Sequence, residues 1–135
     1  MRRRHALVLS LLAALAPAGC SVLAPGDEVC TLAGCRTGLA VELSVRPSAP
    51  FRIEATVPGA TPAGPAYVYE CPDPARCGAV AFFEDFTPAR VTIRVTTPAG
   101  TVTREFTPTY RTHRPNGEDC PPTCRDATVR VDLPS

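Results

Sequence analysis

Apolar and polar residues alternate with a period of two along most of the chain after residue 38. The clearest run places Leu39, Val41, Leu43 and Val45 in one phase, with polar or small residues in the other. Further runs of this kind cover residues 51–57, 91–96 and 127–133. Because successive side chains of a strand point to opposite faces, each run predicts a strand with one buried face.

Weaker alternation over residues 66–71, 79–83 and 101–110 raises the expected number of strands to about seven. Turn-forming residues separate the runs, including Pro58-Gly59 and Pro98-Ala99-Gly100. Proline fixes φ and glycine tolerates positive φ, so both favour turns. No run of helical period reaches about ten residues, so we expect an all-β fold. Short strands with frequent turns predict an antiparallel-dominated β-sandwich, with a small barrel as the alternative.

In strand number and turn spacing, the chain resembles the broad immunoglobulin-like or transthyretin-like sandwich class. The chain has no tryptophan, so the tryptophan-on-disulfide core of true immunoglobulin domains is missing. The resemblance implies one all-β domain, which we expect to cover residues 30–135.

The N-terminus has the parts of a secretory signal. Three arginines at positions 2–4 precede an apolar run over residues 6–16, and small residues follow. A basic start, a short apolar run and small residues before a processing point define such signals. Spanning a bilayer takes about 20 apolar residues, more than this run supplies. We therefore expect the segment to direct export and to be cleaved.

Ala18, Gly19 and Cys20 resemble the end of a bacterial lipoprotein signal, although Pro17 stands where leucine is usual. The resemblance implies a signal over residues 1–19 and lipidation of Cys20. Residues 20–29 would then form the lipidated cysteine and a tether. In Gram-negative lipoproteins the residue after the cysteine influences sorting, and Ser21 would imply the outer membrane.

Ordinary cleavage after Ala18 is the alternative, because Ala16-Pro17-Ala18 fits the A-x-A rule for signal peptidases. That cleavage would release the protein without a lipid. The cysteine count favours lipidation. The chain has seven cysteines, and an odd number in an exported protein leaves one to explain. With Cys20 lipidated, six remain for three disulfides, which persist in oxidising compartments.

The six cysteines fall into three pairs along the sequence. Cys71 and Cys77 bracket a proline-rich loop between two predicted strands, and we expect a local bridge there. The other four form two similar pairs, each preceding a predicted strand: Cys30 with Cys35, and Cys120 with Cys124. If the first and last strands are parallel neighbours, Cys30 meets Cys120 and Cys35 meets Cys124. Local bridges within each pair are the alternative, and the sequence does not choose between them.

The charge of the exported part excludes one class of partner. The formal net charge of the chain is +1, but three of its arginines lie at positions 2–4. Removing them leaves eleven arginines against thirteen acidic residues, a net charge of −2. Nucleic-acid binding depends on neutralising phosphates with clustered basic residues. We therefore expect no nucleic-acid partner.

Few residues suggest chemistry. His113 is the one histidine outside the signal, and we expect it in an exposed loop. Together with Cys120 and Cys124 it resembles the CxxxC-plus-histidine site of envelope copper chaperones, whose motif lies on a thioredoxin fold. The acid pairs Glu84-Asp85 and Glu118-Asp119 read as solvated turns, because calcium needs more ligands than two neighbours supply. We expect no resident metal and no cofactor.

Three phenylalanines suggest a contact surface. Phe82 and Phe83 are adjacent in a predicted strand, so one of them should face outward, and Phe86 follows closely. An exposed aromatic cluster of this kind would mark a binding patch.

These observations favour a non-enzymatic envelope lipoprotein that acts as a structural or binding module. Its expected partners are the membrane, through the lipid anchor, and a protein or envelope polymer. One alternative is a copper or redox protein that uses Cys120, Cys124 and His113. Another is a small secreted inhibitor that presents the loop between Cys71 and Cys77, since preorganised loops bind well.

Overall fold

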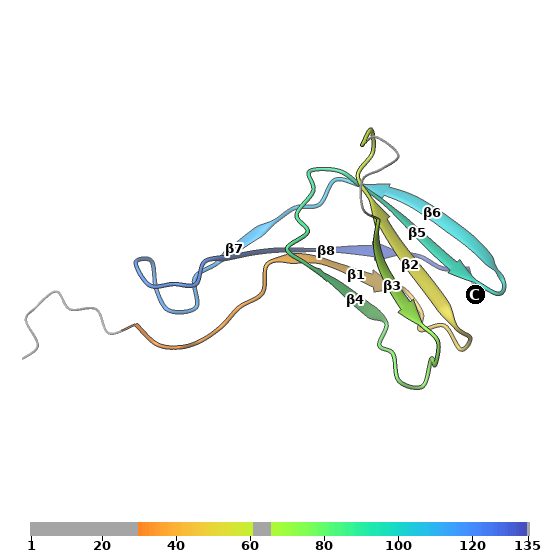
Figure 1. The fold of residues 1–135 in the computed structure, drawn as a ribbon, viewed down its shortest axis with the longest axis horizontal. Coiled ribbons are helices and arrows are strands. Elements are labelled where there is room, and N and C mark those ends of the chain that lie inside the picture. The colour runs from red at the N-terminus through yellow and green to blue at the C-terminus, as the bar shows by residue number, and fades with distance from the viewer. Residues whose placement is uncertain (1–29, 61–65, 135) are drawn as a thin grey trace, which may run out of the picture.

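The computed structural model describes residues 30–60 and 66–134. The expected signal at 1–19, Cys20 and the rest of the tether lie outside these residues. The described chain forms eight strands and confirms the all-β prediction (Figure 1). The strands are β1 Gly38–Leu43, β2 Phe51–Thr56, β3 Tyr67–Cys71, β4 Val80–Glu84, β5 Val91–Thr97, β6 Gly100–Phe106, β7 Arg111–His113 and β8 Cys124–Val131.

The strands form two four-stranded sheets that pack as a sandwich. Sheet 1 has the order β4-β1-β8-β7, and sheet 2 has the order β3-β2-β5-β6. Five strand pairs are antiparallel, and β1 runs parallel to β8 from Gly38 opposite Asp126 to Leu43 opposite Val131. The antiparallel-dominated sandwich is therefore confirmed, with the first and last strands as parallel neighbours.

The strand count is eight rather than about seven because a short strand, β7, follows the run predicted at 101–110. The hairpin partner β6 ends at Phe106, and the chain then crosses to sheet 1, where Arg111 begins β7. Pro108 lies in this crossing, where its missing N–H suits an unpaired segment. Two predicted runs also extend too far, since Val45 and Val57 lie outside the strands with exposed fractions of 48% and 43%.

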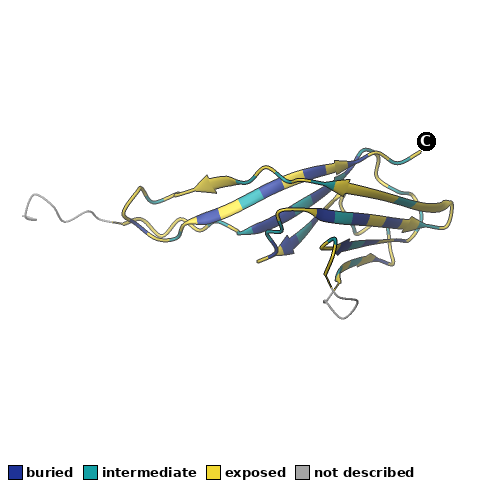
Figure 2. Cartoon of the chain, turned by 90° about the horizontal axis from the view of Figure 1, so that it is seen from above, coloured by how far each residue is buried: buried dark blue, intermediate teal, exposed yellow. Residues whose placement is uncertain are grey.

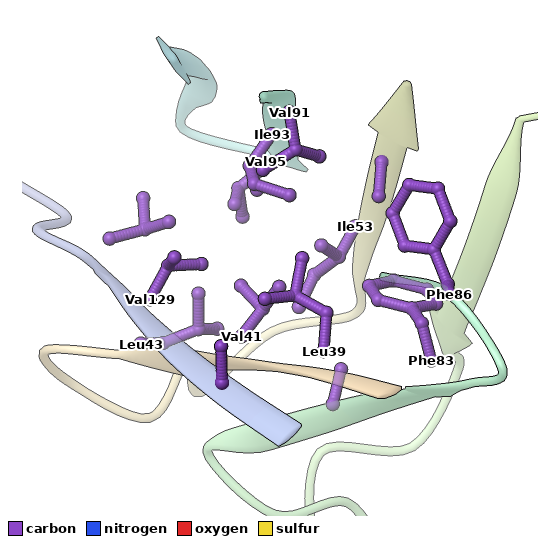
Figure 3. Close-up of a cluster of buried hydrophobic side chains, with 14 of the residues drawn as sticks. Leu39, Val41, Leu43, Ile53, Phe83, Phe86, Val91, Ile93, Val95 and Val129 are labelled. Carbon is purple, nitrogen blue, oxygen red and sulfur yellow. The ribbon is translucent and has the colours of Figure 1, made fainter. Parts of the chain in front are cut away.

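The core lies between the two sheets and takes one face of β1, β2, β4, β5 and β8 (Figure 3). Burial alternates along these strands, and Figure 2 shows the banding most clearly along the longer ones. Each large apolar side chain that is buried contributes about 1.5–3 kcal/mol relative to an exposed one. The largest fully buried aliphatic side chains are Leu39, Val41, Ile53, Val91, Ile93, Val95 and Val131.

The predicted aromatic patch is wrong for two of its three residues. Phe83 and Phe86 are each only 6% exposed and belong to the core. Tyr67 stacks on Phe86 with ring centroids 4.0 Å apart, and Phe83 meets the same tyrosine edge-on. Phe83 takes the inward phase of β4, and Phe86 follows Asp85, whose φ of 54° turns the chain back over the core. Phe82 alone lies on the outer face, half-buried.

Candidate functional site

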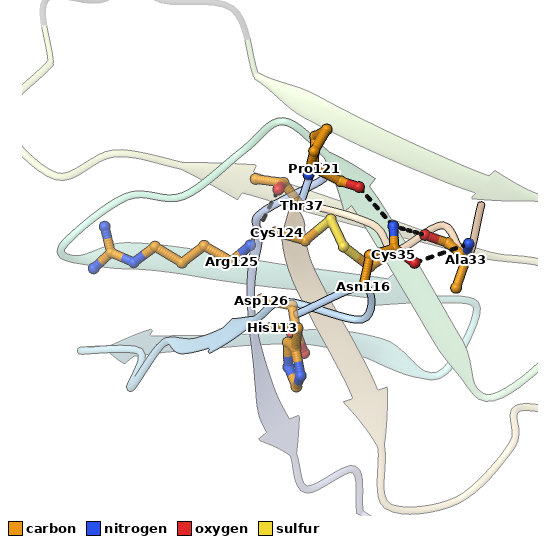
Figure 4. Close-up of a disulfide and its surroundings, with 9 residues drawn as sticks. All are labelled: Ala33, Cys35, Thr37, His113, Asn116, Pro121, Cys124, Arg125 and Asp126. Carbon is orange, nitrogen blue, oxygen red and sulfur yellow. Dashed lines mark hydrogen bonds and ion pairs between the residues drawn. A yellow bond between two sulfur atoms is a disulfide. The ribbon is translucent and has the colours of Figure 1, made fainter. Parts of the chain in front are cut away.

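Two disulfides join the segments that precede the first and last strands. Cys30 is bonded to Cys120 and Cys35 to Cys124, with Cα separations of 5.5 and 5.9 Å. This is the end-to-end pairing rather than the local one. It follows from the parallel β1–β8 pair. Because the two strands start side by side and run the same way, the segments that lead into them also lie side by side. We call residues 30–37 and 114–125 together the stapled end (Figure 4).

Asn116 crosslinks the stapled end with its side-chain amide (Figure 4). Its nitrogen donates to the carbonyl oxygens of Ala33, at 2.9 Å, and Pro121, at 2.6 Å. Its oxygen accepts the N–H of Ala33 at 3.1 Å and the hydroxyl of Thr31. The Asn116 amide therefore pairs with Ala33 as a neighbouring strand would, although residues 30–37 form no strand.

The stapled end is also fixed to sheet 1. The N–H of Arg125 donates to the hydroxyl of Thr37 at 3.1 Å, and the N–H of Asp85 donates to the Thr37 carbonyl at 2.9 Å. Arg36 forms an ion pair with Glu84 at 2.9 Å, and its guanidinium lies 4.0 Å from the Phe82 ring centroid. Phe82 is thus covered by Arg36 and is not the open contact surface that the sequence suggested.

His113 lies on β7 rather than in a loop, opposite Cys124 and in contact with the carboxylate of Asp126. The sulfurs of Cys120 and Cys124 are both in disulfides, so neither is available as a thiolate ligand. Within residues 30–60 and 66–134, no group of three or more His, Cys, Asp or Glu side chains is placed to hold a metal. The second acid pair is exposed, and Glu118 contacts Arg114 at 3.2 Å.

The third disulfide closes the loop between β3 and β4. Cys71 and Cys77 are bonded with a Cα separation of 6.0 Å. Inside the loop the Asp73 carboxylate accepts the N–H of Ala75, and the Asp73 carbonyl accepts the N–H of Arg76, both at 3.0 Å. These bonds close a tight turn, from which the Arg76 side chain projects with 87% of its surface exposed.

No family model, curated protein or solved structure matches this chain. Three disulfides indicate an oxidising compartment, extracellular or periplasmic. In the described part of the chain, no helix is long and apolar enough to cross a membrane.

A groove lies beside the part of β8 that β7 does not cover. The three residues of β7 pair with positions 124–126 only, although β8 continues to Val131. A hollow of about 510 Å³ lies beside the uncovered part of β8. Its lining comprises Phe106, Thr107, Pro108, Thr109, Arg111, His113 and residues 126–130.

The inner face of β6 lies on the same side of the sandwich as this hollow. Val102 and Phe106 point inward and are only half-buried, because no strand of sheet 1 covers them. Arg104 shares their face, since it lies opposite the buried Ile93 in the β5–β6 pair. A second hollow, of about 490 Å³, reaches Val102 and Leu133 at the far end of this side. The two hollows share no lining residue. We call the inner face of β6 at Val102, Arg104 and Phe106, together with the uncovered residues 127–130 of β8, the β6–β8 groove.

The β6–β8 groove was not predicted from the sequence, although one signal was present. Arg104 lies between Val102 and Phe106, at a position where the alternation predicts an apolar, inward-facing residue. A charged residue in the inward phase indicates a strand whose inner face is not covered, and such residues protect sheet edges from unwanted pairing.

Proposed function

We propose that this protein is an exported, lipid-anchored module of the bacterial cell envelope that binds rather than catalyses. One observation carries the proposal. The tether expected at residues 20–29 runs directly into Cys30, whose disulfide to Cys120 joins it to the segment before β8. The three disulfides use six of the seven cysteines, so Cys20 is the one left for a lipid. An anchor there would be tied to the segments before both β1 and β8.

The anchor sets how far the domain reaches from the membrane. A fully extended chain spans at most about 3.6 Å per residue, so a tether of about ten residues reaches about 36 Å. The stapled end would then lie nearest the bilayer. The β5–β6 turn lies at the opposite end of the molecule (Figure 1). Residues 98–101 of this turn line the second hollow.

Binding is favoured over catalysis by the surroundings of His113. Its Nε2 contacts Asp126, and no hydroxyl or thiol hydrogen-bonds to the imidazole among the described residues. Hydrolytic triads need a nucleophile in hydrogen-bond contact with the histidine base. The β6–β8 groove offers instead an uncovered strand edge and half-buried apolar side chains, which suit a binding partner.

Metabolic labelling with an alkyne fatty acid tests the anchor. We expect the wild-type protein to carry the label and to fractionate with membranes. The Cys20→Ala variant should lose both properties while its six remaining cysteines stay oxidised, which shows that the domain still folds. Ser21→Ala is the matched control and should keep the label. An unlabelled wild-type protein, or a labelled Cys20→Ala variant, would refute the lipid anchor.

The two alternative functions have less support. A copper or redox site would need Cys120 and Cys124 as thiolates, and both are bonded to other cysteines. An inhibitory loop that binds as an extended strand would need an open backbone between Cys71 and Cys77. That backbone is closed as a turn by the bonds of Asp73.

A further inference from the structure

The hydrogen bonds of β8 show which of its backbone groups lack a partner. Val131 accepts from the N–H of Ser44, and Arg125 donates to Thr37, so these odd-numbered residues face β1. The N–H and C=O of one strand residue point to the same side, and successive residues alternate. The backbone groups of Thr128 and Arg130 therefore point to the opposite side, where β7 has already ended.

Those backbone groups form an open strand edge along the β6–β8 groove. Thr128 and Arg130 both line the groove and are exposed. An unpaired edge of this kind is a template on which another extended chain can hydrogen-bond. A strand added there would extend sheet 1 opposite β6, and its inward side chains would meet Val102 and Phe106.

We propose that the β6–β8 groove receives an extended segment of a partner protein, which pairs with β8 as an additional strand of sheet 1. The proposal rests on the binding role argued above and names its partner. The segment presents apolar side chains at alternate positions towards sheet 2. Between them it carries a carboxylate that faces Arg104.

Charge complementarity selects an acidic segment. Arg104 and Arg111 form no ion pair with any described residue, and Arg104 hydrogen-bonds only to the adjacent Thr103 carbonyl, at 2.9 Å. Arg130, in contrast, already pairs with Glu42 at 3.3 Å and with Asp132 at 3.8 Å. An apolar residue opposite Arg104 would cover a charge without satisfying it, whereas a carboxylate would pair with it.

The test uses the mature protein and two synthetic peptides. The probe is the acetylated, amidated heptapeptide TVTETVT, whose valines and glutamate share one strand face, and its matched control is TVTKTVT. Amide hydrogen exchange is followed residue by residue as each peptide is titrated. We expect TVTETVT to protect the amides of Thr128 and Arg130 saturably. TVTKTVT should bind about tenfold more weakly or worse, because its lysine faces Arg104.

Charge reversal makes the test specific. Arg104→Glu should invert the preference, so that TVTKTVT protects the same two amides more strongly than TVTETVT. Thr128→Pro removes one donor of the open edge. Because that N–H has no partner among residues 30–60 and 66–134, the variant should fold and bind more weakly. Neither result depends on the lipid anchor, so the two proposals fail independently.

Three results would overturn the proposal. Absence of protection at Thr128 and Arg130 up to millimolar peptide would show that the edge accepts no strand. Equal protection by both peptides, unchanged by Arg104→Glu, would show that the groove does not select an acidic segment. If the amides of Thr128 and Arg130 became protected as the protein concentration rose, with no peptide present, the edge would be assigned to a second copy of this chain.

Discussion

Phe82 lies across the backbone of Gly38, and two carbons of its ring stand 3.0 Å from where a Gly38 β-carbon would be placed. The same β-carbon would collide with the carbonyl oxygen of Phe83. Gly38 also has a φ of +152°, which residues with a side chain rarely adopt. Gly38 begins β1, so this close approach sets how β1 and β4 meet beside the stapled end.

Gly38→Ala should therefore lower the free energy of unfolding by about 2 kcal/mol or more, because either the β1–β4 pair separates or the backbone strains. Urea denaturation measures the effect. Gly34→Ala is the control, since nothing lies within 4 Å of the added carbon, and it should change stability by less than about 0.5 kcal/mol. Equal effects of the two substitutions would contradict the packing described for Phe82.

The end-to-end disulfides should stabilise the domain non-additively. Each closes a loop of about ninety residues, worth about 4.6 kcal/mol in the chain-entropy model. With one bridge present, however, the second closes only a short ring between neighbouring cysteines, worth about 2–3 kcal/mol. Replacing either pair with serine should cost this smaller amount, and replacing both pairs should cost roughly 7 kcal/mol.

Thermal and urea unfolding of the three serine variants check this relation. Replacing Cys71 and Cys77 gives the comparison for a short loop, at about 2.4 kcal/mol. If the two end-to-end bridges contributed independently, removing one would lower the free energy of unfolding by half as much as removing both. That result would argue against their parallel arrangement.

Asn116 should stabilise the stapled end through its amide alone. Asn116→Ala removes three hydrogen bonds of 2.6–3.1 Å to Ala33 and Pro121 and should cost about 2 kcal/mol. Asn116→Asp keeps the acceptor for the Ala33 N–H but turns the donors into a carboxylate that faces two carbonyl oxygens, so it should not restore stability. The rate at which dithiothreitol reduces Cys30–Cys120 should rise in both variants. An unchanged rate would show that Asn116 does not hold this segment.

Tyr110 should make stability sensitive to alkaline pH. Its hydroxyl donates to the Pro88 carbonyl at 2.9 Å, and burial raises its pKa above the ordinary value, against an opposing effect of Arg125. The folded state thus holds this proton more tightly than the unfolded chain, whose tyrosines titrate near pH 10. The stabilisation is complete below about pH 10 and is lost as the pH rises through the folded pKa.

Tyr110→Phe tests this linkage. At pH 8 the variant should be less stable than wild type by about 1 kcal/mol, the contribution of one hydrogen bond. The difference between the two proteins should shrink above about pH 10. Urea denaturation at several pH values measures it, and a gap that stays constant or widens at high pH would contradict the assigned direction of the pKa.

Much of the fold could be predicted from local alternation, because burial on one strand face is a property of neighbouring residues. Leu39, Val41 and Leu43 are buried in the phase that the sequence shows. The strand β7 could not be found this way, since Arg111–His113 is exposed throughout. Its strand conformation comes from pairing with β8, a contact between residues distant in the sequence.

The site was less predictable for a similar reason. Alternation places Phe83 on the opposite face from Phe82, but it cannot say that Arg36 covers the outer ring or that Asp85 turns Phe86 into the core. The end-to-end disulfides were one of two pairings considered, and only the parallel register of β1 and β8 decides between them. The β6–β8 groove exists because β7 is short, and alternation does not encode that length, although Arg104 in the inward phase of β6 indicates an uncovered face.

The intact mass of the protein recovered from its host's envelope, alkylated before and after reduction, tests the central claim most directly. An anchored, triply bridged module should begin at Cys20 with a lipid-sized addition, and its other six cysteines should be alkylated only after reduction. A product that begins at Gly19 without lipid would contradict the anchor. Alkylation of Cys120 or Cys124 before reduction would contradict the stapled end.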